Sequence, residues 1–320
     1  MKLLAPLRYL VALAEHQHYA RAAQACHITQ PALSNAVRAL ESAFGTPLVR
    51  RGRTYAGLTP EGELVLASAR RLLAEAAALE QTLSSRTGEP VGELRLGAVP
   101  SALPVATRFA AALHAAHPRV RTTLLSLNSD DIERGLRDQA LDLGLGFLAR
   151  LPAGGAFEVW PQYDERHYLV QRSATPDPTP IRWADAAALP LCLLTPDMHH
   201  RRLVDDAFAR AGVTAAPVLE TNAVLSLALA VQAGDVAAVM PGALVAALGG
   251  AAADLRVRPL VAPVVTTPVG FIARRDDAPP PVRAAALALA LGDAWRASLA
   301  PWCGSLGTCA AGDGPDAFAP

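Results

Sequence analysis

The 320-residue chain has few aromatic side chains, few cysteines and no long apolar run. Aromatic residues make up 5% of the sequence, so a ligand cage of stacked rings is not expected. Every stretch of about 18 residues, the length of a membrane span, contains a charge or a proline, so no span is expected. The first eight residues contain no apolar segment followed by a small-residue cleavage site, which predicts a cytoplasmic protein.

Motifs of the common catalytic classes are also missing. The sequence contains no Gly-x-Ser-x-Gly, no Gly-x-x-x-x-Gly-Lys, no His-Glu-x-x-His and no cysteine pairs with zinc spacing, so neither an enzyme nor a bound cofactor is expected. The adjacent His199 and His200, taken with His167, leave a metal site as an alternative.

Four cysteines are widely scattered in the sequence, at Cys26, Cys192, Cys303 and Cys309. Reduced and mostly inert thiols of a cytosolic protein are the expectation, because scattered cysteines form no disulfide framework. A redox-sensing pair or a metal clip made by Cys303 and Cys309 stays open.

Charge is balanced overall but unevenly placed. The formal net charge is zero, yet residues 1–58 hold seven basic and two acidic residues, a net charge of +5, which leaves −5 for the rest. A basic head on an acidic body suits a protein that meets an anionic polymer at one end. The length predicts two or three domains, and a hydrophobic content of 52% gives ample material for their cores.

The stretch from Ala20 to Leu40 has the pattern of a helix, a tight turn and a second helix. Leu33, Val37 and Leu40 recur at i, i+4 and i+7 and form an apolar stripe. On the opposite face of the second helix, amide, hydroxyl and guanidinium groups suit base edges and phosphates in a major groove. An ordinary helix pair with a solvated polar face is the alternative. A further helix ending near residue 15 is expected to complete the small core beneath them.

Two short extended pieces around Gly52 predict a hairpin, or wing, with arginines that can meet phosphates or the minor groove. Thr59 and Pro60 then give a second helix start, and the helix continues to Thr87 without a break. Its apolar residues alternate in steps of four and three, a heptad seam that predicts pairing with the same helix of a second subunit. The seam residues are Val65, Ala69, Leu72, Ala76, Leu79 and Leu83. A core helix of the next domain is the alternative.

Beyond residue 88, predicted strands and helices alternate, which indicates a parallel α/β sheet with helices on both faces, in two lobes. Strands are predicted at 94–99, 120–127, 141–147, 158–160, 167–171, 189–194, 218–220, 236–240, 255–261 and 268–274, and helices at 103–117, 130–138, 201–211, 224–233 and 281–299. Residues 303–320 are rich in glycine, alanine and proline and predict a disordered tail.

Several strings resemble the LysR-type transcriptional regulators. They include Tyr19-Ala-Arg-Ala-Ala23, Ile28-Thr-Gln-Pro-Ala-Leu-Ser34, Leu58-Thr-Pro-Glu-Gly62 and Gly92-Glu-Leu-Arg-Leu-Gly97. The resemblance implies a winged helix-turn-helix DNA-binding domain (1–59), a dimerising linker helix (60–87) and an effector-binding domain (88–302) like the periplasmic binding proteins. In that domain, lobe 1 would comprise about 88–163 and 268–302, and lobe 2 about 164–267, with a small-molecule cleft between them.

The resemblance also implies which residues meet DNA. The expected DNA-binding residues are Arg21, Thr29, Gln30, Pro31, Ser34, Asn35, Arg38, Arg50, Arg51 and Arg53. Three positions depart from the family pattern. Ala20 replaces a frequent hydroxyl, Asn35 stands where a basic residue is common, and Val236 replaces a glycine. Asn35 can still read adenine through a bidentate amide pair.

Inducer contacts in such regulators lie at strand ends and helix N-termini that face the cleft. Here the corresponding residues are Pro100, Ser101, Asn128, Phe147, Thr195, His199 and Asn222. Helix N-termini bind carboxylates through free N–H groups and the helix dipole, and His199 and His200 would add positive charge. A small organic acid or similar anion is therefore the expected inducer.

The resemblance further implies a dimer, and usually a tetramer, on dyad-symmetric double-stranded DNA, with RNA polymerase as a partner of an activator and a nucleoid-associated location. Three alternatives remain open. These are a ligand-independent architectural DNA-binding protein, a redox- or metal-responsive regulator, and a solute-binding protein of the transport class. The basic head and the missing signal segment disfavour the last of these.

Overall fold

A computed structural model describes most of the chain. The described residues are 3–50, 52, 55–84, 89–152, 154–173, 178–248, 254–276 and 278–300. Two predicted wing residues (Arg51 and Arg53), the end of the linker helix, Cys303, Cys309 and the predicted tail lie outside them.

Three helices build the N-terminal head, α1 (Leu4–His16), α2 (Tyr19–Ala25) and α3 (Gln30–Phe44). Their apolar sides meet in one small core that also includes Leu48 and Leu58. An antiparallel bridge between Val49 and Leu58 forms the base of the predicted wing. The helix-turn-helix and wing predicted from the sequence are confirmed in the described residues.

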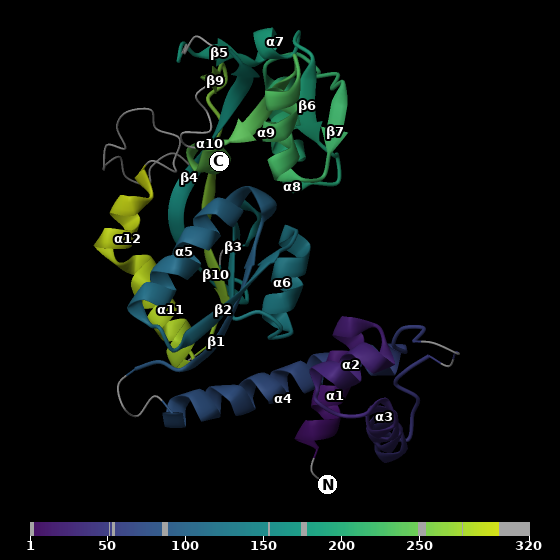
Figure 1. Cartoon of the computed structure of the whole chain (residues 1–320). Helices are drawn as coiled ribbons and strands as arrows, with labels where there is room; N and C mark the ends of the chain where they lie inside the picture. The colour runs from purple at the N-terminus through teal and green to yellow at the C-terminus, as the bar shows by residue number, and fades with distance from the viewer. Residues whose placement is uncertain are drawn as a thin grey trace.

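Helix α4 (Pro60–Ser84) leaves the head as one continuous rod. It begins where predicted, because the Thr59 hydroxyl accepts a hydrogen bond from the Gly62 N–H at 2.9 Å. Gly62 lies so close to the head that a Cβ there would stand 2.0 Å from the carbonyl oxygen of Leu48. The first turns of α4 therefore belong to the head, and its later turns pass under the body (Figure 1).

The predicted heptad seam changes its surroundings along α4. Val65 and Ala69 pack into the head core. Farther along the helix, the side chains of Leu72, Leu79 and Leu83 are 43%, 61% and 56% exposed. The first part of the seam thus packs within the head, whereas the second part is an apolar stripe that is exposed in the single chain.

The body contains two lobes that share one mixed sheet. The strands are β1 (Gly92–Ala98), β2 (Val120–Ser126), β3 (Leu143–Phe147), β4 (Phe157–Arg172), β5 (Ile181–Arg182), β6 (Leu191–Leu194), β7 (Leu219–Thr221), β8 (Ala237–Pro241), β9 (Leu255–Val261) and β10 (Thr266–Arg274). The strand order is β2-β1-β3-β10-β4-β8-β6-β7, with β9 pairing both β4 and β5. The α/β class and the two-lobed organisation are confirmed.

A parallel sheet was expected, but the sheet is mixed, with parallel pairing among β1, β2 and β3 and among β6, β7 and β8. β10 runs antiparallel to both β3 and β4, and β4 runs antiparallel to β8 and β9. The two strands predicted at 158–160 and 167–171 are one long strand, β4. Pro161 does not end it, because the strand is at an edge of lobe 1 there and the missing N–H removes no internal ladder bond.

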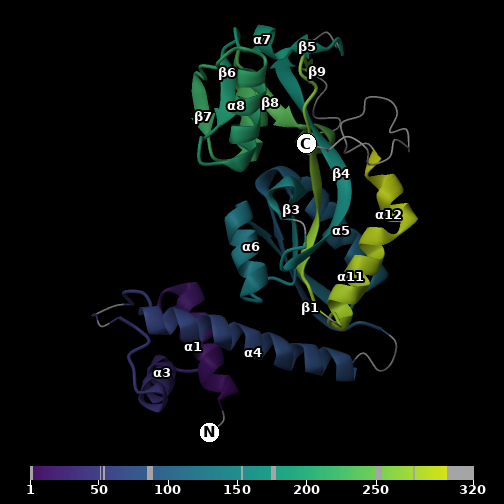
Figure 2. The same cartoon turned by 180° about the vertical axis from the view of Figure 1, so that it is seen from behind.

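Helices cover both faces of each lobe. They are α5 (Leu103–Ala116), α6 (Ser129–Arg137), α7 (Trp183–Ala186), α8 (His199–Arg210), α9 (Val224–Ala233), α10 (Gly242–Leu248), α11 (Pro281–Leu291) and α12 (Asp293–Ser298). In lobe 1, α6 lies on one side of the strands and α5 and α11 on the other (Figures 1 and 2). None of the helices in the described part of the chain combines the length and apolarity needed to cross a membrane.

Two features of the body were not predicted. The C-terminal helix expected at 281–299 is interrupted at Gly292, whose extended backbone (φ −68°, ψ 140°) ends α11 and precedes α12. The short elements β5, α7 and α10 were missed, because so few residues carry too little periodicity to be recognised.

Strand β4 carries the crossing between the lobes. Up to Arg166 it pairs with β10 of lobe 1, and from His167 onward it pairs with β8 and then β9 of lobe 2. Glu165 is completely buried just before this crossing, and its carboxylate accepts a hydrogen bond from the Ala243 N–H at 3.1 Å. Burial raises the pKa of Glu165 to about 8, so this carboxyl group carries a proton at neutral pH.

Substituting Gly62 by alanine should unfold the head at lower temperature. The new Cβ cannot coexist with the Leu48 carbonyl oxygen 2.0 Å away, so the helix must shift, at a cost of about 3 kcal/mol, the upper end of the usual range for overpacking. Thermal unfolding followed by circular dichroism measures the loss. Gly45→Ala is the control, because Gly45 (φ +68°) has free space and its variant costs only about 1–2 kcal/mol. Equal effects of the two substitutions would contradict the close approach.

Substituting Glu165 by glutamine should flatten the dependence of body stability on pH. A raised folded-state pKa gives stability that is complete below pH 4.5 and is lost as pH rises towards 8, so the wild type should lose up to about 2 kcal/mol between pH 6.5 and 8.5. Glutamine cannot titrate, and the variant should melt a few degrees higher than the wild type at pH 8.5. The control is Asp164→Asn, which changes an exposed carboxylate next to it. If the melting temperatures of the wild type and of Glu165→Gln changed with pH in the same way, Glu165 would not carry a buried proton.

Candidate functional site

The predicted recognition helix, α3, is apolar on one face and polar on the other. Leu33, Val37 and Leu40 are buried in the head core, which confirms the predicted stripe. On the opposite face Gln30 and Arg38 are exposed. Thr29 caps the helix, since its hydroxyl accepts from the Ala32 N–H at 3.4 Å. The other predicted residues of this face are also accessible, with Pro31 and Asn35 exposed and Ser34 partly so.

Helix α2, which carries the exposed Arg21, is capped by a residue that sequence reasoning did not single out. The Nδ1 atom of His18 accepts hydrogen bonds from the N–H groups of Ala20 and Arg21, at 3.2 and 3.5 Å. His27 lies in the turn between α2 and α3 with a left-handed backbone (φ 55°). The turn is therefore tight, and it fixes the angle between α2 and α3.

The wing is tied to α3 by a single carboxylate. Glu41 accepts hydrogen bonds from the backbone N–H groups of Leu48 and Val49, at 2.9 and 3.1 Å. Arg50 folds back along the wing and donates from Nε to the Leu58 carbonyl at 2.8 Å, which leaves its terminal nitrogens for other contacts. A groove of about 620 Å³ runs between helix and wing, with Arg38 and Arg50 on its walls. Two arginines thus flank one groove on the basic head.

A second site lies in the body, between the two lobes. The cavity has a volume of about 320 Å³, near the lower end of ligand pockets. It lies at the carboxyl ends of β1, β2 and β3 of lobe 1 and β6 of lobe 2, where ligands bind in open α/β sheets. Phe147 of lobe 1 and His199 of lobe 2 meet across it, with ring centroids 4.8 Å apart.

Most of the predicted inducer contacts come together at this cavity. Its lining contains Pro100, Ser101, Asn128, Phe147 and His199. Thr195 and Asn222 are not among the lining residues. Asn222 is exposed to solvent. The backbone N–H of Thr195 donates to the Thr221 carbonyl at 2.9 Å, which continues the pairing of β6 with β7.

Polar groups around the cavity lack partners. The hydroxyl oxygens of Ser101 and Ser129 and the Nε2 atom of His200 are buried without a hydrogen-bond partner among the described residues. The short 3-10 turn Pro100–Ala102 before α5 and the N-terminus of α8 at His199 also carry no side-chain cap. Buried polar groups normally find partners, so this arrangement indicates a ligand that accepts and donates hydrogen bonds here.

Asn128 lines the cavity as predicted, but its side chain already has hydrogen-bond partners within the protein. Its side-chain oxygen accepts from the Asp131 N–H and its side-chain nitrogen donates to the Asp131 carboxylate, both at 2.8 Å. Both ends of the amide are therefore used to cap α6. Asn128 is part of the cavity wall, and its amide oxygen and one of its two amide N–H groups are engaged in this cap.

Charged groups at the cavity were missed from the sequence. Arg150 and Arg202 line it together with Asp130, Asp131 and Asp197. Arg150 follows the predicted strand end at Phe147 by only three residues, and this position was the signal that could have identified it. Arg202 lies one turn into α8, beyond the helix start that sequence reasoning placed at 201.

Histidines do not supply positive charge at the cavity, and this expectation is wrong. Burial lowers the pKa of His200 well below its usual value, and burial with the nearby Arg150 and Arg202 lowers the pKa of His199. The ring of His200 lies against that of His167, centroids 5.1 Å apart, and burial lowers the pKa of His167 to about 4. Within the described ranges, no group of three or more possible ligands is arranged to hold a metal ion.

The two cysteines that the structure places do not lie at the cavity. Cys192 is completely buried in the core of lobe 2, and Cys26 is partly buried in the head. Burial raises the pKa of both thiols, which makes them less reactive. Neither residue supports the redox-responsive alternative.

A larger hollow, of about 730 Å³, separates α4 from the base of lobe 1. Arginines on its wall are held in ion pairs, Arg95 with Asp142 at 2.7 Å and Arg283 with Asp276. It lies at the amino end of β1, away from the carboxyl ends of β1, β2 and β3, and between two domains. The smaller interlobe cavity is therefore the candidate ligand site.

Comparisons with known proteins identify both parts of the chain. A family model described as "Bacterial regulatory helix-turn-helix protein, lysR family" matches residues 4–63. A second, described as "LysR substrate binding domain", matches residues 87–295. A curated relative, the SDS degradation transcriptional activation protein of Pseudomonas sp., is 42% identical over 166 residues, 49% of this chain and 52% of that protein. The chain spans about half the length of the curated relatives it matches.

Solved structures extend the likeness to nearly the whole chain. A full-length OxyR variant from Pseudomonas aeruginosa superposes with a TM-score of 0.69 at 27% identity, covering 90% of this chain and 96% of that one. Full-length CbnR complexed with its target DNA gives a TM-score of 0.65 over 89% of this chain and 97% of that one, and at 23% identity it shows the fold alone. The head, the linker helix and the two-lobed body thus occur together in proteins of one kind, and the chain belongs to the LysR family of bacterial helix-turn-helix regulators.

Proposed function

We propose that this protein is a sequence-specific DNA-binding transcriptional regulator whose activity is modulated by a small organic anion bound between its lobes. The observation that carries the DNA-binding part is the polar face of α3. Its opposite face is buried, so the exposed amide, hydroxyl and guanidinium groups are free to enter a major groove. The head's net charge of +5 favours approach to an anionic polymer.

The uncovered half of the α4 seam supports a dimer. Leu72, Leu79 and Leu83 form an exposed stripe on a helix that ends at Ser84 in the described part of the chain. This stripe can pack against the same stripe of a second subunit, because two such helices bury equivalent faces. Two heads then read a dyad-symmetric site.

A second exposed apolar surface supports the tetramer. It is on lobe 2, where Val218 and Leu219 of the β7 edge are exposed, as are Leu225 and Leu229 of α9. A tetramer on DNA and, for an activator, a contact with RNA polymerase complete the proposed set of macromolecular partners.

Three features support an anionic inducer in the interlobe cavity. Helix N-termini without side-chain caps face it, Ser101 and His200 line it with unpartnered atoms, and two arginines are on its wall. Val99, Phe147 and Leu194 offer apolar surface beside them. A relative is named for the degradation of SDS, so an alkyl sulfate belongs with the carboxylates among the anions to test.

Substituting Arg38 by alanine should weaken operator binding by about 1–3 kcal/mol, because this guanidinium is exposed on the face proposed to meet base edges or phosphates. A gel-shift titration with DNA from the protein's own genomic neighbourhood at fixed salt measures the loss. Arg134→Ala is the control, since it removes the same charge from α6 in the body. Unchanged binding by Arg38→Ala would show that another element enters the groove.

Substituting Leu79 by glutamate should convert the dimer to a monomer. The change places a charge in the middle of the exposed part of the seam, where two copies of the helix would meet. Light scattering after gel filtration reports the mass. Thr82→Glu is the matched control on an exposed position outside the seam. A Leu79→Glu protein that keeps the mass of the wild-type oligomer would contradict pairing through α4.

A further inference from the structure

We propose that Arg150 binds the negatively charged group of the cavity ligand, and that Asp130 holds this guanidinium as a built-in competitor until the ligand displaces it. This inference rests on the proposed ligand-binding function of the interlobe cavity. It names the residue that carries anion recognition and the step that recognition requires.

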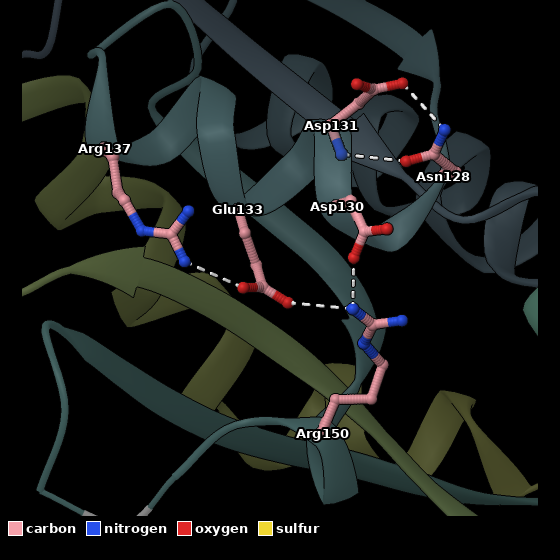
Figure 3. Close-up of polar contacts among 6 residues, drawn as sticks. All are labelled: Asn128, Asp130, Asp131, Glu133, Arg137 and Arg150. Atoms are coloured by element: carbon pink, nitrogen blue, oxygen red, sulfur yellow. Dashed lines mark hydrogen bonds and ion pairs between the residues drawn. The ribbon is translucent and has the colours of Figure 1, made fainter.

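Arg150 ends the short turn after β3, and it reaches the start of α6 (Figure 3). Its Nη2 atom contacts the Asp130 carboxylate and lies 3.5 Å from Glu133. The other oxygen of Glu133 binds Arg137 at 2.9 Å. Glu133 is therefore shared between two arginines, whereas the described contacts of the Asp130 side chain are to Arg150 alone.

Asp130 is a weakly held partner. Its side chain is 69% exposed, against 25% for Arg150 and 18% for Glu133. Exposed ion pairs contribute little because water solvates the separated charges nearly as well. Asp130 can therefore turn out into solvent without leaving a buried charge behind.

The bond between Asp130 and Arg150 also leaves one donor unused. The Nε atom of Arg150 is buried and has no hydrogen-bond partner within the described part of the chain. A carboxylate or sulfate that approaches this side of the guanidinium accepts from Nε and a terminal nitrogen together. Such a ligand gains a hydrogen bond that Asp130 does not make here, and this gain favours the exchange.

The charges around the cavity explain why displacement is required. Its lining holds two arginines, Arg150 and Arg202, and three aspartates, Asp130, Asp131 and Asp197, while the histidines are held neutral by burial. The lining as a whole therefore offers no net positive charge to attract an anion. Recognition depends on one guanidinium that must first release its own carboxylate.

The buried side chains of the cavity determine which other groups the ligand must carry. Ser101 and His200 are 2% and 5% exposed, and the unpartnered Oγ and Nε2 atoms of these two lining residues can bond a neutral polar group. Apolar side chains such as Phe147 lie beside them. The ligand class is a monoanion with a compact apolar or aromatic body of about the size that 320 Å³ admits.

The experiment measures binding of three anions, each with a neutral counterpart, to the full chain by isothermal titration calorimetry. The pairs are benzoate with benzamide, hexanoate with hexanamide, and octyl sulfate with octanol. The variants are Arg150→Gln, Asp130→Asn and the control Arg119→Gln, which breaks the ion pair with Glu89, both residues lying outside the cavity lining. Melting curves check that each variant folds.

We expect at least one anion to bind the wild type more tightly than its neutral counterpart. Arg150→Gln should weaken that anion at least tenfold and leave the neutral compound unchanged. Asp130→Asn should tighten it threefold or more, because the competitor is removed, and Arg119→Gln should match the wild type. The selectivity between anion and neutral compound is the decisive readout, because a purely structural role of Arg150 would change both alike.

Three results would overturn all or part of the inference. If an anion binds the wild type and Arg150→Gln binds it equally well, this inference is wrong and the ligand cavity stands. If no anion binds the wild type, both this inference and the proposed anionic inducer are wrong, while the gel shift with Arg38→Ala still decides DNA binding. If Asp130→Asn binds the anion no more tightly than the wild type does, only the proposed role of Asp130 as a competitor is wrong.

Discussion

The backbone of β4 is the constraint on which the body depends. Its first part completes the sheet of lobe 1 beside β10, and its last residues complete the sheet of lobe 2 between β8 and β9. Neither lobe can satisfy its strand hydrogen bonds without this strand, so β4 joins the two lobes. The buried Glu165 lies just before the crossing and His167 just after it, and burial raises the pKa of the first and lowers the pKa of the second.

Helix α4 gives the head a comparable connection to the body. Its first turns are part of the head core, through Gly62 against the Leu48 carbonyl and through Ala69. Farther on, Gln81 packs within about 3 Å of the point where a Cβ would stand on Gly92, the first residue of β1. Arg70 also lies 4.0 Å from Asp138 after α6. These contacts connect lobe 1 to the helix that carries the head.

The cavity gains its chemistry from groups that no single element supplies. Strand ends of both lobes, the starts of α6 and α8 and the turn that carries Arg150 converge on it. Because its lining holds no excess of positive charge, the proposed selectivity depends on the geometry of individual groups, above all the unpartnered atoms of Ser101, His200 and Arg150. Family membership accounts for the architecture of this site, whereas the proposed class of ligand rests on these particular side chains.

The sequence by itself determined the head and most of the secondary structure. The helix-turn-helix followed from the spacing of Leu33, Val37 and Leu40 and from the Thr29 cap, because helical periodicity and capping are local properties of the chain. Five of the seven predicted cavity residues also line the cavity, since strand ends and helix starts can be located from local pattern.

Only the tertiary structure decided the rest. The antiparallel pairing of β10 with β3 and β4 joins segments that lie far apart in the sequence, and no local pattern records such a partner. The neutral state of His199 and His200 arises from burial by both lobes, and the hold of Asp130 on Arg150 arises from a turn meeting the start of a helix in another part of lobe 1. Pairing direction, burial and side-chain partners depend on which segments meet in space, and folding alone establishes that.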